Sequence, residues 1–221
     1  LGSAFLEVFV TENGKTTKLV FSGDLGQPDQ PILKDPAVET GADFLIIEST
    51  YGGRLHQIYD KETRLLEVVN DTMDRGGNLV IPSFAVGRTQ TLLYYFYNLS
   101  KQGRLDPDIP IIIDSPLAIA ATRVFLKNTQ DFDDEALELF KESGKIIKFP
   151  QVRVCETAAE SRALNSEEGS AIIISASGMC DAGRILHHLK HNLWRPESTI
   201  LSVGYQPEGS LGRRLVDGIK R

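Results

Sequence analysis

The chain has 221 residues, 41% of them hydrophobic and 24% charged, which is ordinary for a globular protein with one large domain or two small ones. Its formal net charge of −6 excludes a protein that coats nucleic acid through general positive charge, but it does not exclude a local basic groove. No apolar run reaches the roughly 18 residues that a membrane helix needs, and no secretory signal opens the chain. Cys155 and Cys180 are far apart and belong to no cysteine cluster, so we expect a reduced, cytoplasmic protein.

The first residues predict a β-hairpin. β-Branched and aromatic residues at 5–10 and 16–21 flank a turn that contains Asn13 and Gly14. A loop rich in proline and aspartate follows over 27–40.

From residue 43 onward, short apolar runs alternate with helical segments. Strands that are apolar along their whole length are typical of a sheet covered on both faces. The alternation therefore predicts an α/β domain with a Rossmann-like, three-layer architecture and a mainly parallel sheet. We place the boundary with the hairpin between residues 52 and 60. The expected strands are 44–48, 78–82, 110–114, 145–149, 170–175 and 198–203, and the expected helices are 60–75, 88–101, 117–127, 134–143, 157–164 and 182–192.

Two acidic motifs follow apolar runs near the start of the chain. Asp24 lies between glycines in Phe21-Ser22-Gly23-Asp24-Leu25-Gly26, where it is either a turn residue or a metal ligand. Glu48 ends an apolar run and precedes Ser49, Thr50 and Tyr51. Glutamate is a poor strand residue and a poor cap, so Glu48 is either a surface group or a partner that orients a metal ligand.

Three later turns join a strand to a helix. Ser83 and Arg88 lie where hydroxyl, glycine and a helix N-terminus can form a phosphate site, or simply a helix cap with a surface arginine. Asp114, Ser115 and Pro116 predict capping of the next helix. Ser175, Ser177 and Gly178 form a small-residue turn that allows backbone to approach a ligand closely.

The histidines and the last glycine-rich segment point to little chemistry. His187 and His191 have the spacing of a helical metal pair, but no zincin glutamate follows His187, so a solvated face that includes His188 is the preferred interpretation. His56 is a lone loop histidine that is either functional or exposed. Residues 204–215 match neither common nucleotide-binding glycine motif, so we expect no nucleotide cofactor.

Taken together and in order, these motifs resemble the β-CASP branch of the metallo-β-lactamase superfamily, a group of RNA- and DNA-processing nucleases. The resemblance extends over almost the whole chain and is strongest to prokaryotic members related to the cleavage-and-polyadenylation endonuclease. The segments that carry it are Leu1-Gly2-Ser3-Ala4, 21–26, Glu48-Ser49-Thr50-Tyr51-Gly52, 83–90, Asp114-Ser115-Pro116-Leu117, 175–179 and Gly204-Tyr205-Gln206.

The resemblance implies a role for each acidic motif. Asp24 matches the aspartate that bridges two zinc ions, and Glu48 matches an acidic residue that orients a histidine near the metals. The implied domains are an incomplete metallo-β-lactamase portion over 1–55, which is its hairpin remnant, and a β-CASP domain over 56–221. From their placement we further predict contacts to RNA phosphates from Ser49, Thr50, Tyr51, Ser83, Arg88, Ser175, Ser177 and Gly178.

Departures from the family pattern on both sides of the acidic motifs bear on activity. The HxHxDH zinc signature and the histidine expected just before Leu1 are absent, and so are two later histidines. One carboxylate is too few for a catalytic zinc site, which needs about three protein ligands. The chain is therefore expected to be a central fragment of a zinc-dependent ribonuclease, inactive alone and without bound zinc.

Other functions stay open at this stage. One is a non-catalytic RNA-binding or scaffold member of the same family, and another is a nuclease that acts on DNA. RNA is the expected partner, and a homodimer is compatible with the resemblance. A small-molecule hydrolase is disfavoured, because a whole α/β domain is a larger cover than a small substrate requires.

Overall fold

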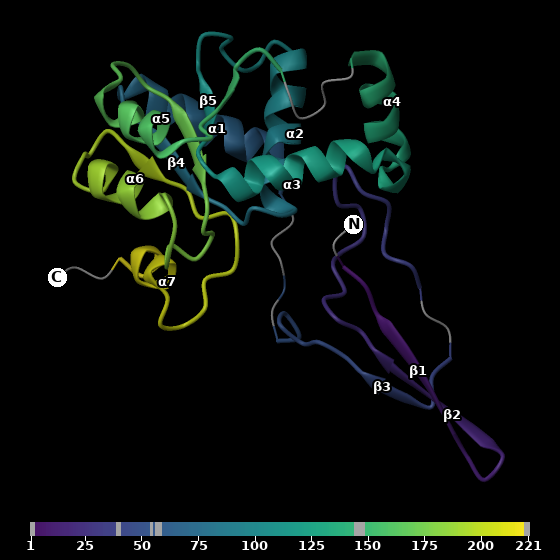
Figure 1. The fold of residues 1–221 in the computed structure, drawn as a ribbon. Helices are drawn as coiled ribbons and strands as arrows, with labels where there is room; N and C mark the ends of the chain where they lie inside the picture. The colour runs from purple at the N-terminus through teal and green to yellow at the C-terminus, as the bar shows by residue number, and fades with distance from the viewer. Residues whose placement is uncertain (1–2, 39–40, 54, 56–58, 144–148, 219–221) are drawn as a thin grey trace.

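The computed structural model describes residues 3–38, 41–53, 55, 59–143 and 149–218, and they form a three-stranded sheet and a five-stranded sheet (Figure 1). The smaller sheet projects from the larger α/β body as an arm, with the hairpin turn at its far end (Figure 1). Within the described residues, no helix is both long and apolar enough to cross a membrane.

The arm contains the predicted hairpin and one more strand. β1 (Leu6–Glu12) pairs antiparallel with β2 (Lys15–Phe21), and β3 (Phe44–Ile46) pairs parallel with β2. Asn13 and Gly14 both have positive φ, as a tight hairpin turn requires. The hairpin prediction is confirmed, whereas the third strand ends two residues earlier than expected.

The larger sheet is entirely parallel and has the order β6-β5-β7-β4-β8. The predicted α/β class with a mainly parallel sheet is therefore confirmed. The strands are β4 (Leu79–Pro82), β5 (Ile111–Ile113), β6 (Val152–Val154), β7 (Ile172–Ser175) and β8 (Thr199–Ile200). The seven α-helices of the described chain are α1 (Lys61–Asp74), α2 (Arg88–Lys101), α3 (Pro116–Lys127), α4 (Asp134–Ser143), α5 (Ala158–Ala163), α6 (Ile185–Asn192) and α7 (Leu211–Val216).

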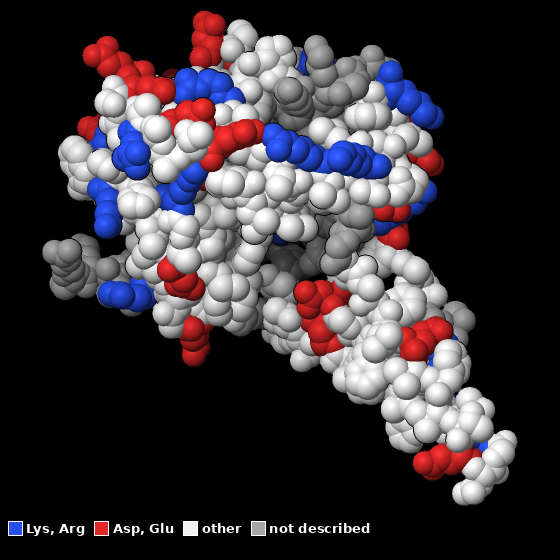
Figure 2. Space-filling view, in the orientation of Figure 1, with Lys and Arg blue, Asp and Glu red and all other residues white. Residues whose placement is uncertain are grey.

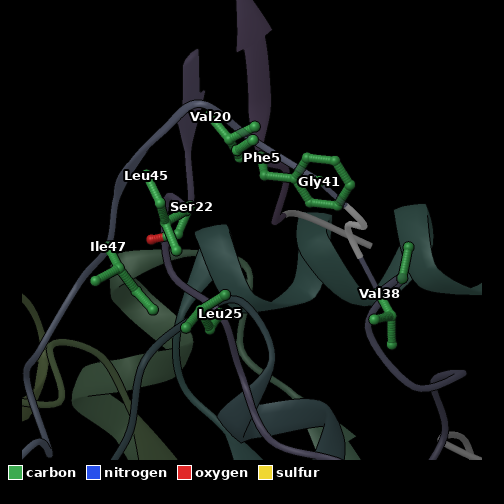
Figure 3. A pocket seen from close by; sticks show the side chains of 10 residues that line it. Phe5, Val20, Ser22, Leu25, Val38, Gly41, Leu45 and Ile47 are labelled. Carbon is green, nitrogen blue, oxygen red and sulfur yellow. The ribbon is translucent and has the colours of Figure 1, made fainter. Parts of the chain in front are cut away.

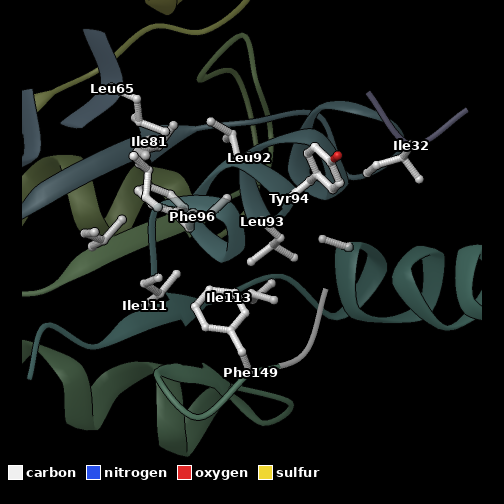
Figure 4. Packing of buried hydrophobic residues seen from close by; sticks show 14 of the residues in the cluster. Ile32, Leu65, Ile81, Leu92, Leu93, Tyr94, Phe96, Ile111, Ile113 and Phe149 are labelled. Atoms are coloured by element: carbon white, nitrogen blue, oxygen red, sulfur yellow. The ribbon is translucent and has the colours of Figure 1, made fainter. Parts of the chain in front are cut away.

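Alternate residues of the central strands separate the two helical layers. Ile174 of β7 is paired with Ile81 of β4 on one side and with Ile113 of β5 on the other. All three side chains belong to one large core that also contains residues of α1 to α4 (Figure 4). The intervening Val80 lies on the other face, in a cluster with residues of α6 against which α7 packs. Ile112 and Ile173 belong to a third cluster there, beside α5. This arrangement is the three-layer architecture that the sequence predicts.

The loop at 27–37 attaches the arm to the body. Ile32 is buried in the large core (Figure 4), although it precedes the predicted second domain. Leu33 forms an isolated β-bridge with Phe132, and the N–H of Asp133 donates to the carbonyl of Ile32 at 2.9 Å. The connection between the two sheets is thus packed along part of its length.

Several predicted elements differ from the structure, and two observed elements were not predicted. The sequence predicts neither β6 nor α7. The expected strand at 145–149 lies outside the described residues except for Phe149, and β6 is the strand that pairs with the outer edge of β5. The strand expected at 198–203 is limited to two residues in β8, and α6 begins three residues later than expected because residues 182–184 form a turn.

Candidate functional site at the carboxyl edge

The two acidic motifs lie next to each other at the carboxyl ends of β2 and β3. Phe21 and Ile46 are paired residues of these strands, and the N–H of Ser22 donates to the carbonyl of Ile46 at 2.9 Å. The N–H of Glu48 donates to Oγ of the buried Ser22 at 2.9 Å. A parallel register therefore brings two motifs together that are 24 residues apart in the chain.

The carboxylate of Glu48 accepts hydrogen bonds from its own loop. The N–H of Thr50 donates to Oε2 at 2.8 Å. This bond is the largest cause that lowers the pKa of Glu48, with help from the Thr50 hydroxyl and from the N–H of Leu25. Since Leu25 directly follows Asp24, the carboxylate of Glu48 also fixes the loop that carries the other acid. Its role in orienting a histidine stays a prediction.

The backbone around Asp24 is closely packed, and its side chain is exposed. Oγ of Ser3 donates to the carbonyl of Asp24. A Cβ added to Gly23 would lie 2.5 Å from the carbonyl oxygen of Ala4, and Gly23 has a φ of +54°. Only glycine fits there, so the motifs at residues 3–4 and 21–26 form one unit.

The described residues do not by themselves fit a zinc centre. Among them there is no group of three histidine, cysteine, aspartate or glutamate side chains placed to hold a metal ion. A hollow of about 400 Å³ opens beside Leu25 (Figure 3), but apolar residues and glycine line most of it and Ser22 supplies a hydroxyl. A lining of this kind is suited to contact with an apolar group rather than to metal coordination.

The second part of the site is the carboxyl edge of the parallel sheet, which we define as the turns that follow β4, β5, β7 and β8. The N–H of Ser83 donates to the carbonyl of Ser175 at 2.9 Å, and Oγ of Ser175 donates to the carbonyl of Asp114 at 2.8 Å. Both serines are buried. The structure therefore brings three of the predicted motifs together, with Ser83 and Ser175 bonded inside the edge.

The predicted phosphate turn at α2 has no side-chain cap, although the N–H groups of Arg88 and Thr89 donate to the carbonyls of Val86 and Phe84. Gly87 is the N-cap, and no side chain caps the helix there. Arg88 is half-buried in a first turn that contains no acidic residue. Among the predicted contacts, Arg88 and Ser177 are half-buried, whereas Ser49, Thr50 and Tyr51 are exposed.

The turns after β7 and β8 are fastened to each other. Nε2 of Gln206 donates to the carbonyl of the buried Gly178 at 2.8 Å. Oγ of Ser177 accepts from the N–H of Asp181 at 3.2 Å. Residues 177–178 are thus held by hydrogen bonds within their turn and to the turn after β8.

A buried charge network lies behind this edge, and sequence reasoning missed it. Asp114 is fully buried and its Oδ1 accepts from Nη1 of Arg184 at 2.6 Å, while Oδ2 accepts from Oγ of Ser161 at 2.5 Å. Nε2 of His188 lies 2.6 Å from Oδ2. Burial raises the pKa of Asp114, but the hydrogen bonds from His188, Ser161 and Arg184 outweigh it and leave the pKa lowered. The one sequence feature that pointed to a buried charge was the position of Asp114 directly after three isoleucines.

The histidines of α6 face two environments. His187 and His191 are exposed, as a solvated face predicts. The same prediction is wrong for His188, which is 1% exposed because α6 packs this side against the sheet next to Asp114. His56 lies outside the described residues.

One aromatic contact joins the acidic motifs to the carboxyl edge. The rings of Tyr51 and Tyr205 meet edge to face with centroids 6.0 Å apart. Tyr51 lies three residues after Glu48, and Tyr205 lies in the turn after β8. The two halves of the candidate site are therefore neighbours in space.

Charged groups are unevenly distributed over the face in Figure 2. The arm presents mostly uncharged atoms, with isolated acidic groups, whereas basic side chains line the region of α3 in the body (Figures 1 and 2). That helix contains Arg123 and Lys127 and no acidic residue. Arg123 forms an ion pair with Glu156, so the local positive charge of this helix is small.

Comparison with known proteins identifies related chains. The family model described as Beta-Casp domain matches residues 89–215. "Ribonuclease TTHA0252" of Thermus thermophilus is 37% identical over 94% of this chain and 48% of its own length. The "RNase J-like protein" and the "Transcription termination factor FttA" of Methanocaldococcus jannaschii are 34% and 32% identical over the whole chain, which covers 50% and 35% of those proteins.

The chain thus spans about half or less of the length of these relatives. The matched segment runs from the first turn of α2 into α7 and contains the carboxyl edges of β5, β7 and β8. It covers more than half of the chain, and the chain belongs to the Beta-Casp domain family.

Proposed function

We propose that this chain is part of a ribonuclease that hydrolyses RNA phosphodiester bonds. The observation that carries the proposal is the Tyr51–Tyr205 contact, because it places the acidic loops beside the carboxyl edge of the parallel sheet. Carboxyl edges are where parallel α/β sheets commonly bind ligands. Two of the similar proteins have names that denote RNA cleavage, which supports RNA as the substrate.

In this proposal, the edge holds the phosphate backbone and the acidic loops face the bond to be cleaved. Arg88 in the first turn of α2 suits a phosphate, since both its guanidinium and the positive end of the helix dipole favour negative charge. Ser49, Thr50 and Ser177 supply further polar contacts, while buried Ser83 and Ser175 support the edge from below. Tyr51 borders the same surface, whereas Gly178 is buried against Phe84.

Zinc is part of the proposal, with Asp24 as one ligand and Glu48 positioning a histidine. The described residues do not complete such a centre. The proposal is that the complete site holds two zinc ions. Asp24 is one of the ligands, and residues that are not part of this 221-residue chain supply the others. The 221-residue chain alone is expected to be inactive. Homodimer formation and a cytoplasmic location stay predictions.

The test compares the 221-residue chain with the complete open reading frame of its gene. Each is incubated with 5′-labelled single-stranded RNA and with DNA of the same sequence, with and without EDTA. We expect EDTA-sensitive cleavage of RNA by the complete protein and none by the chain alone. In the complete protein, Asp24→Asn is expected to lower the cleavage rate at least 100-fold, whereas Asp108→Asn in an exposed turn leaves it unchanged.

Other outcomes identify the alternatives. RNA binding without cleavage by the complete protein would support a scaffold, and preference for the DNA strand would support a DNA nuclease. EDTA-sensitive cleavage of RNA by the 221-residue chain would overturn the assignment of the missing ligands.

A further inference from the structure

We propose that Phe84 is a stacking platform for one unpaired base of a single-stranded RNA. This inference rests on the proposed function and names the form of RNA that the carboxyl edge accepts. Phe84 follows β4 directly after buried Ser83, and it is 40% exposed at the sheet edge.

One edge of the ring lies against two glycines that come from two different strand ends. A Cβ on Gly178 would lie 2.9 Å from Cδ2 and 3.1 Å from Cε2 of Phe84, and a Cβ on Gly204 would lie 3.5 Å from Cε2. One edge of the ring is therefore seated where neither the β7 turn nor the β8 turn has a side chain. This close fit explains why position 178 is glycine, whereas a Cβ at position 204 would make only ordinary contact with the ring.

The backbone under the ring is also fixed. The carbonyl of Phe84 accepts from Oγ1 of Thr89 at 2.8 Å and from its N–H at 3.3 Å. Gly178 is tied to Gln206 by the 2.8 Å bond described above. A partly exposed aromatic ring on a fixed backbone loses little conformational entropy when a flat partner stacks on it.

The surroundings favour a nucleic acid over an apolar protein partner. Phe84 lies four residues before Arg88 and just before the uncapped start of α2, whose first turn carries no acidic group. An aromatic surface beside a site that attracts phosphate is the combination that binds single strands, because each base can stack while its phosphate lies in positive potential. A base in a duplex is already stacked on both faces, so the platform selects unpaired RNA.

The test measures binding to the 221-residue chain by fluorescence anisotropy, with oligoadenylate, oligouridylate and a duplex RNA as probes. Phe84→Leu is expected to weaken oligoadenylate binding about 5- to 140-fold, which corresponds to about 1–3 kcal/mol for one stacked base. The loss for oligouridylate is smaller, since uracil stacks less strongly. Trp194→Leu removes an exposed aromatic at the end of α6 and is expected to leave every affinity unchanged.

A second variant reports stacking directly and does not depend on a loss of binding. Phe84→Trp in a Trp194→Phe background leaves one tryptophan, since Trp194 is the single tryptophan of the chain. Its fluorescence is expected to be quenched by oligoadenylate, with affinity close to that of the unaltered chain. Absence of quenching while RNA is bound would overturn the platform.

The failures of the two proposals are distinguishable. If Phe84→Leu binds single strands as tightly as the unaltered chain, the platform is wrong and the proposed function stands. If Phe84→Leu changes the sedimentation coefficient of the chain but leaves its RNA affinity unchanged, Phe84 is a contact between protein molecules. This result would also overturn the platform. If neither the chain nor the complete protein binds single-stranded RNA, the proposed function fails first.

Discussion

Asp114 and His188 are 74 positions apart in the chain, yet Oδ2 of Asp114 lies 2.6 Å from Nε2 of His188 inside the protein. Arg184 extends this link, because its guanidinium also donates to the carbonyls of Cys155 at 2.8 Å and Glu156 at 3.0 Å. One buried carboxylate therefore connects the ends of β5 and β6 to α6. This network holds the turns of the carboxyl edge from behind.

Replacing Asp114 with asparagine is expected to lower the free energy of unfolding by about 3 kcal/mol. The substitution keeps the size of the side chain but leaves the charge of Arg184, only 19% exposed, without its partner. Chemical denaturation followed by circular dichroism measures the change. Asp74→Asn, at an exposed position in α1, is the control and is expected to stay within about 0.5 kcal/mol. Equal losses in both variants would refute a structural role for the network.

The same carboxylate predicts a pH dependence. The pKa of Asp114 in the folded protein is below its ordinary value of 3.8, so between these two values the unfolded chain binds more protons. The stabilisation by Asp114 is therefore complete above its ordinary pKa and is lost as the pH falls through the folded value. Unfolding measured from pH 7 to pH 2 should show the difference between wild type and Asp114→Asn shrinking at the acidic end. A difference that is constant with pH would contradict this.

Gly77→Ala is expected to be strongly destabilising. A Cβ there would lie 2.0 Å from the carbonyl oxygen of Glu197, so the backbone that leads into β8 must move. The expected loss is about 3 kcal/mol, at the upper end for overpacking, because the obstacle is backbone and cannot change rotamer. Thermal unfolding compares this variant with Gly53→Ala, where a Cβ meets nothing within 4 Å and stability should be unchanged or slightly raised. Similar melting temperatures for the two variants would refute the close approach.

Ser115→Ala is expected to cost about 1 kcal/mol through loss of the α3 cap. Oγ of Ser115 accepts from the N–H of Ala118 at 3.2 Å, and Pro116 occupies the first turn. Ser115→Gly is the matched variant, and it should cost only a few tenths of a kcal/mol because glycine is itself tolerated at a cap. Urea denaturation gives both values. A larger loss for glycine than for alanine would show that the hydroxyl contributes something other than capping.

Much of the α/β body could be predicted because its elements have strong local patterns. β4, β5 and β7 are mainly aliphatic runs that need both faces covered, and α2 and α4 begin and end where the sequence predicts. The capping role of Ser115 is confirmed as well. Each of these features is determined by residues that are close in the sequence, within about one helical turn or one strand.

The missed elements lack such patterns. β6 is an edge strand with one neighbour, and it contains the exposed Arg153 between two valines. α7 has six residues and two arginines in a glycine-rich stretch, although Ser210 caps it. Tertiary packing rather than propensity stabilises both.

The site was predictable in its parts but not in its connections. The motifs of Asp24, Glu48, Ser83 and Ser175 are visible locally, and the parallel register brings them into pairs. The bonds of Asp114 to Ser161, Arg184 and His188 span 47, 70 and 74 positions. No local pattern encodes contacts of that range, so Asp114 was expected only to lie before a helix cap.

The central place of β7 has a consequence for how the chain acquires its fold. β4 and β5 both pair with β7 and not with each other, although both precede it in the chain. During synthesis from the N-terminus, their inner edges thus have no strand partner until residues 172–175 have left the ribosome. Pairing over such distances is slow, and unpaired strand edges are the surfaces that aggregate and that chaperones recognise. Truncation before β7 is therefore expected to give an insoluble product rather than a smaller folded domain.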